Sequence, residues 1–273
     1  MTALSPADLA AYRRRIGWDG PARADRATLG AIVAAHAASI AFENLDPLLG
    51  RPVSIALGDI VAKLVHARRG GYCFEQNGLL EAALGTLGFA TTGYAARVMW
   101  RVPDDVINAR THKILRVELD DGPVIVDVGL GGQVLTGVLD LVPDTAQDTP
   151  HGPYRLVRDG ALWRQEALVH GIWRPTYAFD EQPQQPIDYE LANWYTAASP
   201  RSHFRTTLIV GRHPPGRRVT LRNFELTVRR DGLAAERRTL ADADALCDTL
   251  EGEFGIALPD RAALVARIDA GLA

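Results

Sequence analysis

The stretch Arg69-Gly70-Gly71-Tyr72-Cys73-Phe74-Glu75-Gln76-Asn77 joins a glycine loop to a segment with helical periodicity. Apolar residues recur at helical spacing after it, which predicts a helix over residues 73–87 that begins at or just after Cys73. The first amide groups of a helix lack backbone acceptors and lie at the positive end of its dipole, so this position favours an anion such as a thiolate. The same cysteine could equally be a small buried apolar side chain, and both interpretations stay open at this point.

Three further helices are predicted upstream of this loop. Ser5 stands where an N-cap is expected before a helix over residues 6–12. Apolar residues at helical spacing predict two more helices, over residues 26–41 and 57–65. The first third of the chain is therefore expected to be helical.

The middle third changes to the periodicity of β-strands. Short segments rich in strand-forming residues alternate with turn signals, and Asp121-Gly122 and Asp159-Gly160 are typical of tight hairpin turns. The predicted strands span residues 94–102, 113–119, 124–128, 154–157, 162–164 and 173–179. Successive hairpins of this kind predict an antiparallel barrel or a strongly curled sheet.

The last third mixes both periodicities. Gln182-Pro183-Gln184-Gln185-Pro186 is predicted to be a linker and Asp231-Gly232 a hairpin turn. Helices are predicted over residues 187–195, 242–254 and 260–270, and strands over 204–210 and 219–228, the last with a kink. The order helical, β and mixed divides the chain into residues 1–90, 91–185 and 186–273, and clefts between such parts often hold sites.

Composition narrows the class of protein. The 273 residues are 47% hydrophobic and 23% charged, as in a folded globular protein. A net charge of −3 favours neither a nucleic acid nor an acidic membrane as a partner, and we interpret the pairs Arg217-Arg218 and Arg229-Arg230 as solvated surface. No apolar run could span a bilayer, and the N-terminal residues lack the pattern of a signal peptide. Two cysteines, Cys73 and Cys247, make no disulfide framework, so we expect a reducing cytoplasm.

His112 differs from the other histidines by its context. It precedes a predicted strand that pairs, through a turn at Asp121-Gly122, with a second strand containing Asp127. With that turn Asp127 faces Arg116, and Asp127 and His112 point to the same side of the sheet. A two-residue shift of the turn keeps this parity and brings the two side chains closer, whereas a one-residue bulge breaks it. The alternative is a buried acid paired with Arg116 or Arg97.

Cys73, His112 and Asp127 are therefore candidates for one catalytic group. A nucleophile, a base and an acid that orients the base perform acyl transfer: the thiolate attacks a carbonyl, the histidine protonates the leaving group, and a second nucleophile resolves the thioester. A zinc site made from the same three residues is a weaker alternative, because no Cys-x-x-Cys or His-x-x-x-His pair accompanies them.

The motif around Cys73 resembles the active-site signature of the arylamine N-acetyltransferases, and the likeness spans nearly the whole chain. The further motifs follow in the same order as in that family. They are Phe42-Glu43-Asn44-Leu45-Asp46, Gly50-Arg51-Pro52-Val53, Thr111-His112, Val126-Asp127-Val128-Gly129-Leu130-Gly131-Gly132, Asn193-Trp194-Tyr195 and Ser199-Pro200-Arg201-Ser202-His203-Phe204.

The resemblance implies an α+β fold: an N-terminal helical bundle carrying Cys73, a central antiparallel β-barrel carrying His112 and Asp127, and a C-terminal α/β lid. It implies a papain-like triad and a ping-pong acyltransferase without a tightly bound cofactor or metal. Acetyl-CoA acetylates Cys73, and an arylamine, hydrazine or arylhydroxylamine then takes the acetyl group. The residues implied to contact the coenzyme are Thr111, Gly129, Gly131, Gly132 and Phe204. Those implied to contact the acceptor are Phe42, Tyr72, Leu130 and Phe204.

Three residues are expected to support this site. Arg69 suits Glu43 as the partner in a buried bidentate pair that would fix the loop of Cys73. Asn77, one turn after Cys73, could hydrogen-bond the same loop. Ordinary surface or capping roles are the alternative for these residues. We expect Phe74 to belong to the core, and the protein to act as a monomer or homodimer.

Leu130 departs from the family's pattern. Many relatives carry Phe at this place, where the resemblance implies a contact with the acceptor, and Leu removes an edge-to-face partner for an aromatic ring. The acetyl-transfer chemistry is untouched, but the preference for aromatic amines is left open. Two other functions compete: an amide synthase that closes a macrolactam from a carrier-bound polyketide with the same triad, and a cysteine hydrolase of the papain or transglutaminase type.

Overall fold

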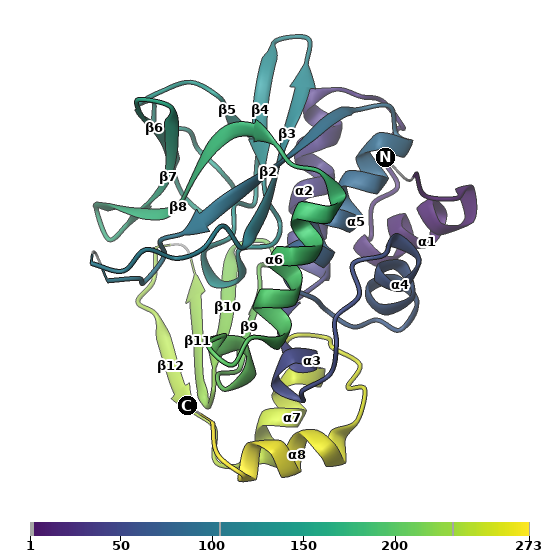
Figure 1. Cartoon of the computed structure of the whole chain (residues 1–273), viewed down its shortest axis with the longest axis vertical. Coiled ribbons are helices and arrows are strands. Elements are labelled where there is room, and N and C mark those ends of the chain that lie inside the picture. Colours follow the sequence, from purple (N-terminus) through teal and green to yellow (C-terminus); the bar gives the residue numbers. More distant parts are fainter. Residues whose placement is uncertain (1–2, 104, 231, 273) are drawn as a thin grey trace.

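The computed structural model describes residues 3–103, 105–230 and 232–272. Along this part of the chain, helices come first, a large antiparallel sheet follows, and a second sheet with two helices ends the fold (Figure 1). The predicted α+β class is confirmed.

Amphipathic segments with capping residues make up the N-terminal part. The side chain of Ser5 accepts a hydrogen bond from the amide of Asp8, as an N-cap does, and Asp25 caps the second helix in the same way. Leucine, isoleucine and valine side chains from these helices share one buried core. The elements are α1 (Pro6–Ile16), α2 (Arg26–Ser39), β1 (Phe42–Glu43), α3 (Leu45–Leu48), α4 (Leu57–Ile60), a π-helical turn η1 (Val61–His66) and α5 (Cys73–Thr86).

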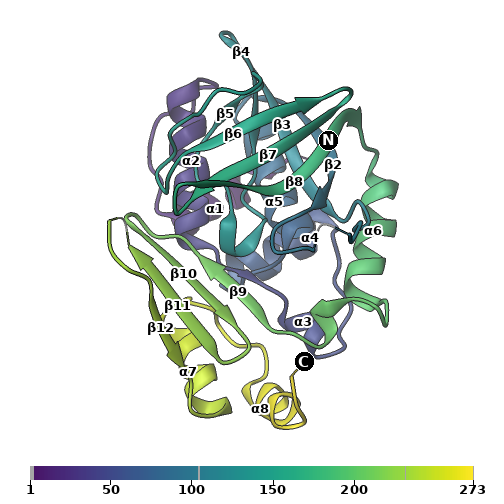
Figure 2. The ribbon, with the colours of Figure 1, turned by 90° about the vertical axis from the view of Figure 1, so that its left-hand side faces the viewer.

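The middle sheet has the strand order β5-β4-β3-β2-β8-β7-β6. It curls strongly (Figure 2), and an isolated bridge between Pro143 and Leu156 brings the chain after β5 to β6, so that the sheet nearly closes into a barrel. Buried aromatic side chains, including Tyr94, Tyr154 and Tyr177, fill its interior. The strands are β2 (Ala90–Val98), β3 (His112–Leu119), β4 (Gly122–Val126), β5 (Leu139–Asp140), β6 (Tyr154–Asp159), β7 (Leu162–Val169) and β8 (Ile172–Pro183).

The β3–β4 hairpin turns one residue earlier than predicted. Leu119 pairs with Gly122, so Asp120 and Asp121 form the turn, and Gly122 begins β4 with a φ of +124° that glycine tolerates without a steric penalty. Leu115 consequently pairs with Val126, a register shifted by two residues from the predicted one. The predicted pairing of Asp127 with Arg116 is wrong. In the β6–β7 hairpin Asp159 pairs with Leu162, so Gly160 and Ala161 form the turn, one residue later than predicted.

The second sheet has the order β1-β9-β10-β11-β12, so the short β1 of the N-terminal part forms its edge. Phe42 of β1 pairs with Gly211 of β9 and also bridges Gly71, which ties this sheet to the loop before α5. Helices α7 and α8 cover it through a buried apolar core. The bounds are β9 (Ile209–Arg212), β10 (Arg217–Arg222), β11 (Glu225–Arg230), β12 (Glu236–Thr239), α7 (Ala243–Gly252) and α8 (Arg261–Asp269).

Several predicted boundaries in this last part need correction. The predicted kink within residues 219–228 is a hairpin turn, where Asn223 takes a φ of +50°. The predicted strand 204–210 begins instead with a short 3-10 helix, η3 (His203–Arg205). Of the predicted linker 182–186, only Gln184 and Gln185 connect β8 to α6 (Pro186–Ala198). The predicted turn at Asp231-Gly232 falls partly outside the described residues.

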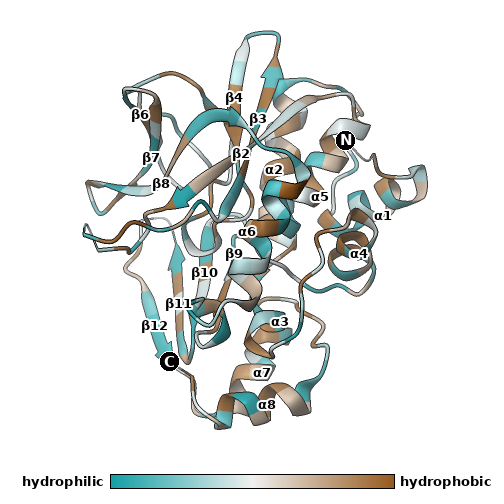
Figure 3. Cartoon of the chain, viewed as in Figure 1, coloured by the Kyte–Doolittle hydropathy of each residue, from teal (hydrophilic) through white to brown (hydrophobic). Residues whose placement is uncertain are grey.

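The outer edge of the second sheet is polar. Every residue of β12 is exposed, and Figure 3 shows this strand as hydrophilic along its length. Charged edge strands discourage pairing with another chain. Among the described residues no helix combines the length and apolarity needed to cross a membrane.

A chain of buried hydrogen bonds crosses the helical part and ends on the loop before α5. Tyr12 Oη donates to His36 Nδ1 (2.9 Å), and His36 Nε2 donates to Gln76 Oε1 (2.6 Å). The side-chain amide of Gln76 donates to the carbonyl oxygen of Gly71 at 3.1 Å. Complete burial lowers the pKa of His36 to about 4, so its imidazole is neutral in the folded chain at neutral pH.

We expect His36 to make the protein less stable as the pH falls from 6.5 to about 4, by up to roughly 3 kcal/mol. The pKa of His36 is lower in the folded chain, so the unfolded chain binds the proton more readily in this window. Urea unfolding at several pH values measures the effect. The dependence should weaken in His36→Gln and persist in His66→Gln, which changes an exposed histidine. Equal pH dependence in all three proteins would contradict this assignment.

Candidate active site

Cys73 is the first residue of α5 and is 5% exposed. The two glycines before it are required by close packing: a Cβ at Gly70 would lie 2.2 Å from the carbonyl oxygen of Ala41, and one at Gly71 would lie 2.7 Å from Glu75 Oε2. The loop can therefore approach its neighbours only without side chains at these two positions. The Sγ atom of Cys73 points to the carbonyl oxygen of Thr111, 3.4 Å away.

His112 and Asp127 meet where β3 begins and β4 has just ended. His112 Nε2 lies 2.7 Å from Asp127 Oδ2, which leaves Nδ1 for the thiol of Cys73, a residue that lines the same cavity. Burial acts to lower the pKa of His112, but the Asp127 carboxylate overrides it and raises the pKa to about 10. The site therefore favours an imidazolium, the partner that stabilises a neighbouring thiolate.

Asn77 and Gly129 fix Asp127 from the other side. Asp127 Oδ1 accepts hydrogen bonds from Asn77 Nδ2 at 2.8 Å and from the amide of Gly129 at 2.7 Å. Asn77 also donates to the carbonyl oxygen of Lys113 at 2.7 Å. Asn77 thus joins α5 to the ends of β3 and β4, and the expectation that it bonds the loop of Cys73 is wrong. Gln76, the preceding residue in the same motif, makes that bond instead.

The buried Arg69 bridges two acids. Its Nη2 donates to Glu43 Oε1 and its Nη1 to Asp46 Oδ1, both at 2.9 Å. The expected bidentate pair with Glu43 alone is therefore corrected to a three-residue arrangement that includes Asp46. Asp46 also binds Lys63 Nζ at 2.7 Å, a residue that sequence reasoning did not place at the site. The only sequence signal for Lys63 is that it is one of two lysines in the chain.

A cavity of about 780 Å³ opens onto Cys73 and His112. Six residues expected to contact the coenzyme or the acceptor line it: Phe42, Thr111, Gly129, Leu130, Gly132 and Phe204. Two others do not. Tyr72 is completely buried, with its ring against Phe204 and its hydroxyl on Asn193. Gly131 lies behind the wall with a φ of +77°, and His213 Nε2 donates to its carbonyl oxygen at 2.6 Å.

Phe74 is buried, as expected, at 2% exposure. Its ring packs edge to face against Tyr72 and tilts against Tyr189 of α6. Phe74 therefore belongs to the small apolar cluster behind the cavity.

Arginines line the arm of the cavity formed by the second sheet, and sequence reasoning missed them. Arg222, Arg229 and Arg237 face it from β10, β11 and β12, and Arg101 from the loop after β2. Arg229 Nε is buried without a hydrogen-bond partner among the described residues. Burial lowers the pKa of Arg229, and the charges of Arg101, Arg218 and Arg237 add to that effect. Such an uncompensated positive group attracts an anion.

The interpretation of the arginine pairs as solvated surface is wrong for two of their members. Arg218 is 6% exposed and donates to the carbonyl oxygen of Val134 at 3.0 Å and to Tyr154 Oη at 2.9 Å. Arg229 lines the cavity. Within the described residues no group of three or more His, Cys, Asp or Glu side chains could hold a metal ion.

Comparison with known proteins gives consistent matches over the chain. The family model described as N-acetyltransferase matches residues 25–263. A curated arylamine N-acetyltransferase of Mycolicibacterium smegmatis is 46% identical over 259 residues, which cover 93% of this chain and 94% of that protein. One of Escherichia coli strain K12 is 43% identical over 250 residues, covering 91% and 89%.

Solved structures also match over nearly the whole chain. The arylamine N-acetyltransferase of Mycobacterium marinum superposes with a TM-score of 0.94 and 38% identity, covering 97% of this chain and 100% of that one. A second structure of that protein, in complex with CoA, gives the same values. The Salmonella typhimurium arylamine N-acetyltransferase superposes with a TM-score of 0.92 and 38% identity, covering 98% and 100%.

We expect Gly129→Ala to make Cys73 less reactive without unfolding the protein. A Cβ at Gly129 would lie 2.6 Å from the backbone Cα of Cys73, so α5 or the Asp127 loop must move and the Cys73–His112 contact weakens. A thiol without an activating partner is only a few per cent thiolate at neutral pH, so iodoacetamide labelling of Cys73 at pH 7 should slow by about tenfold.

The matched control is Gly58→Ala, because no atom lies within 4 Å of a Cβ built there and its φ is not positive. Its labelling rate should equal that of the wild type. Thermal melting of both variants separates a local displacement from a general loss of folding. An unchanged labelling rate in a folded Gly129→Ala protein would contradict the close approach of these two residues.

Proposed function

Because this chain belongs to the arylamine N-acetyltransferase family, we propose that it carries an acetyl group on Cys73 from acetyl-CoA to an arylamine, a hydrazine or an arylhydroxylamine. The observation that carries this proposal is the bond between His112 Nε2 and Asp127 Oδ2 at 2.7 Å, beside an open cavity that Cys73 and His112 both line. The chain is an acyltransferase that uses acetyl-CoA as its co-substrate.

In the first half-reaction, His112 takes the thiol proton of Cys73, giving a thiolate beside an imidazolium. The thiolate attacks the carbonyl carbon of the acetyl group, and the positive N-terminal end of α5, where Cys73 lies, favours the developing oxyanion. The bond from the acetyl carbon to the coenzyme sulfur then breaks. His112 returns its proton to that sulfur, and free CoA leaves an acetyl thioester on Cys73.

In the second half-reaction, the acceptor nitrogen or hydroxyl oxygen attacks the thioester carbonyl. His112 accepts the proton that the acceptor loses, and the bond from the acetyl carbon to Sγ breaks. The proton then returns to Cys73. Asp127 holds the imidazole in the tautomer that places Nδ1 towards the sulfur in both steps, because its own bond takes Nε2.

The cavity supports a small aromatic acceptor. Its volume of about 780 Å³ lies in the range of small-molecule sites. Phe42 and Phe204 meet edge to face with ring centroids 6.0 Å apart, and Leu130 supplies an aliphatic wall in place of a third ring. A relative from Salmonella typhimurium, 42% identical over 227 residues, is named an arylamine N-acetyltransferase and N-hydroxyarylamine O-acetyltransferase, which supports both acceptor classes.

The arginine-lined arm suits the phosphates of the coenzyme. Arg101, Arg229 and Arg237 line the same cavity as Cys73. The Nε of Arg229 is a buried donor without an acceptor among the described residues. Phosphate oxygens supply such acceptors together with the compensating negative charge. We place the thioester end of acetyl-CoA at Thr111 and Gly129 and its phosphates at these arginines.

Three broader expectations stay predictions. The division at residues 1–90, 91–185 and 186–273 assigns the bundle, the barrel and the lid to separate units. A monomer or homodimer remains the expected assembly. We also expect the protein to work in a reducing compartment such as the cytoplasm, because the chemistry needs Cys73 as a free thiol.

Incubation with acetyl-CoA alone should add one acetyl group to the wild-type protein and none to Cys73→Ala. The thioester is stable only until an acceptor arrives, so an aniline or isoniazid should remove the acetyl group and restore the original mass. Intact-mass spectrometry measures both steps, and a thiol reagent measures the CoA released. No adduct, together with no CoA release in the presence of these acceptors, would refute the proposed function.

Arg229→Gln should raise the KM for acetyl-CoA by roughly tenfold, the effect of losing one charge-assisted hydrogen bond. The rate with p-nitrophenyl acetate, an acetyl donor without phosphates, should stay at the wild-type value. Arg14→Gln, which changes an exposed arginine on α1, is the matched control and should leave both rates unchanged. A KM for acetyl-CoA that does not change in Arg229→Gln would remove this arginine from the coenzyme site.

A further inference from the structure

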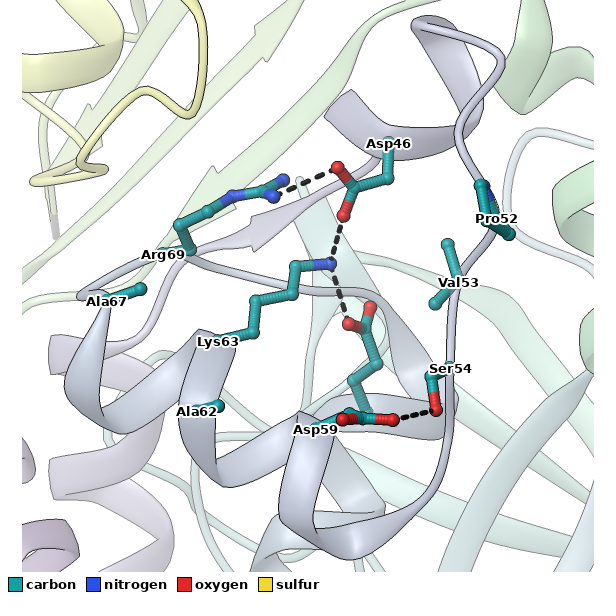
Figure 4. A pocket seen from close by; sticks show the side chains of 10 residues that line it. Asp46, Pro52, Val53, Ser54, Asp59, Ala62, Lys63, Ala67 and Arg69 are labelled. Atoms are coloured by element: carbon teal, nitrogen blue, oxygen red, sulfur yellow. Dashed lines mark hydrogen bonds and ion pairs between the residues drawn. The ribbon is translucent and has the colours of Figure 1, made fainter.

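Five charged residues form a buried cluster beneath the loop that carries Cys73; we call it the charge brace, and it consists of Glu43, Asp46, Lys63, Arg69 and Glu75. Lys63 Nζ lies 2.6 Å from Glu75 Oε1 and 2.7 Å from Asp46 Oδ2 (Figure 4). Arg69 completes it through its bonds to Asp46 and Glu43. The residues come from β1, α3, η1, α5 and the loop between η1 and α5, so the brace joins four elements to that loop.

Glu75 connects the brace to the loop itself. Its Oε2 accepts the amide of Tyr72 at 3.0 Å, while its Oε1 binds Lys63. The carboxylate folds back so closely that it fills the space where a side chain at Gly71 would lie. Glu75 is 1% exposed. The backbone before Cys73 is therefore held by a buried carboxylate, which the Lys63 ammonium in turn binds.

The brace holds three carboxylates against two cations. An excess negative charge in a buried cluster favours protonation of one of its carboxylates. Protonation of Glu75 at Oε1 would put a hydrogen between this oxygen and the Lys63 ammonium, which has only donors to offer. The charge-assisted bond between them is then lost, because the hydroxyl oxygen that remains is a weaker acceptor, and the side chain is held less firmly against the loop.

We propose that Glu75 is a positioning residue for Cys73: as a carboxylate held by Lys63 it keeps the thiol against His112, and its protonation loosens the loop and slows the reaction of the thiol. This inference rests on the proposed function only where it implies that a less reactive Cys73 slows acetyl transfer. The reactivity of Cys73 itself can be measured without acetyl transfer. No covalent step is involved; Glu75 takes one proton from solvent.

Glu75 titrates near neutral pH, where the reactivity of Cys73 can be measured. Burial raises its pKa to about 7, Lys63 and the Tyr72 amide act to lower it, and Glu43 acts to raise it. The other charged groups of the brace are Asp46 of α3 and Arg69 of the loop. For Lys63, burial acts to lower the pKa, but Glu43, Glu75 and Asp46 raise it, so this side chain stays charged.

Positioning and simple electrostatics predict opposite effects on the thiol. A negative charge near Cys73 disfavours the thiolate, so if only the field of Glu75 mattered, protonation would make the thiol more reactive. If Glu75 holds the loop, protonation separates Cys73 from His112 and makes the thiol less reactive. The sign of the change therefore distinguishes the two roles.

The test is the rate of Cys73 alkylation by iodoacetamide between pH 5.5 and 8.5. We expect the wild-type rate to fall by about tenfold as the pH falls through the pKa of Glu75, since a thiol without its histidine partner is only a few per cent thiolate. Glu75→Gln keeps an acceptor for the Tyr72 amide but mimics the protonated acid. Its rate should stay near the low wild-type value throughout, without this step.

Asp59→Asn is the matched control. Asp59 lines the same hollow as Lys63 and Glu75, but it is exposed and accepts a hydrogen bond from the nearby Ser54 at 2.6 Å. Its profile should keep the wild-type step. Urea unfolding of each variant shows whether the protein remains folded at each pH.

Lys63→Met provides a second, independent variant. Removing the ammonium leaves Glu75 without its counter-charge, so the step should move to higher pH by about 1 to 3 pH units. This variant can adapt by protonating Glu75, so it does not depend on Glu75→Gln being folded. A step that stays at its wild-type pH in Lys63→Met, or one that survives in Glu75→Gln, would overturn the proposal.

A rate that rises on acidification in the wild type but not in Glu75→Gln would also overturn it, because Glu75 would then act through its field alone. The two proposals fail separately. Absence of an acetyl adduct with a normal alkylation step would refute the proposed function and leave the positioning role intact. A normal acetyl adduct without a Glu75-dependent step would do the reverse.

Discussion

A buried carboxylate must have its oxygens matched by donors, and Asp127 meets this requirement by drawing three parts of the chain together. His112 comes from the start of β3, Asn77 from α5, and the amide of Gly129 from the chain after β4. Since Asp127 is 0% exposed, water cannot replace any of these donors. The bonds to this one side chain help to fix the position of α5, and so of Cys73, against the barrel.

Parity explains why the Asp127–His112 pair could be predicted from the sequence while its register could not. In an antiparallel hairpin, side chains separated by an even number of positions share a face whichever even register is adopted. The observed register differs from the predicted one by two residues. Asp127 and His112 therefore still share a face of the sheet, whereas the predicted pairing of Asp127 with Arg116 is lost. The turn itself depended on whether Gly122 belongs to the loop or to β4, which a dipeptide pattern does not decide.

Contacts between distant segments could not be predicted, because no periodicity links their residues. Lys63 reaches Asp46 only because the turn of α4 and η1 lays it against α3. A helical pattern gives the face of Lys63 but not the element that will cover that face. Nothing in the Gly70-Gly71 pair identifies its neighbours, and only the structure shows that Ala41 and Glu75 occupy the space where side chains would lie.

Arg218 and Arg229 depart from the usual avoidance of like charges on directly opposite residues of a sheet. They pair directly across β10 and β11, and like charges in that position destabilise a sheet. Arg218 is satisfied by carbonyl and hydroxyl oxygens of the barrel, whereas Arg229 keeps an unpaired Nε at the cavity wall. The repulsion is therefore not cancelled within the described chain. A conflict between local preference and global fold is expected at functional sites, and an anionic ligand in the cavity is what would remove this one.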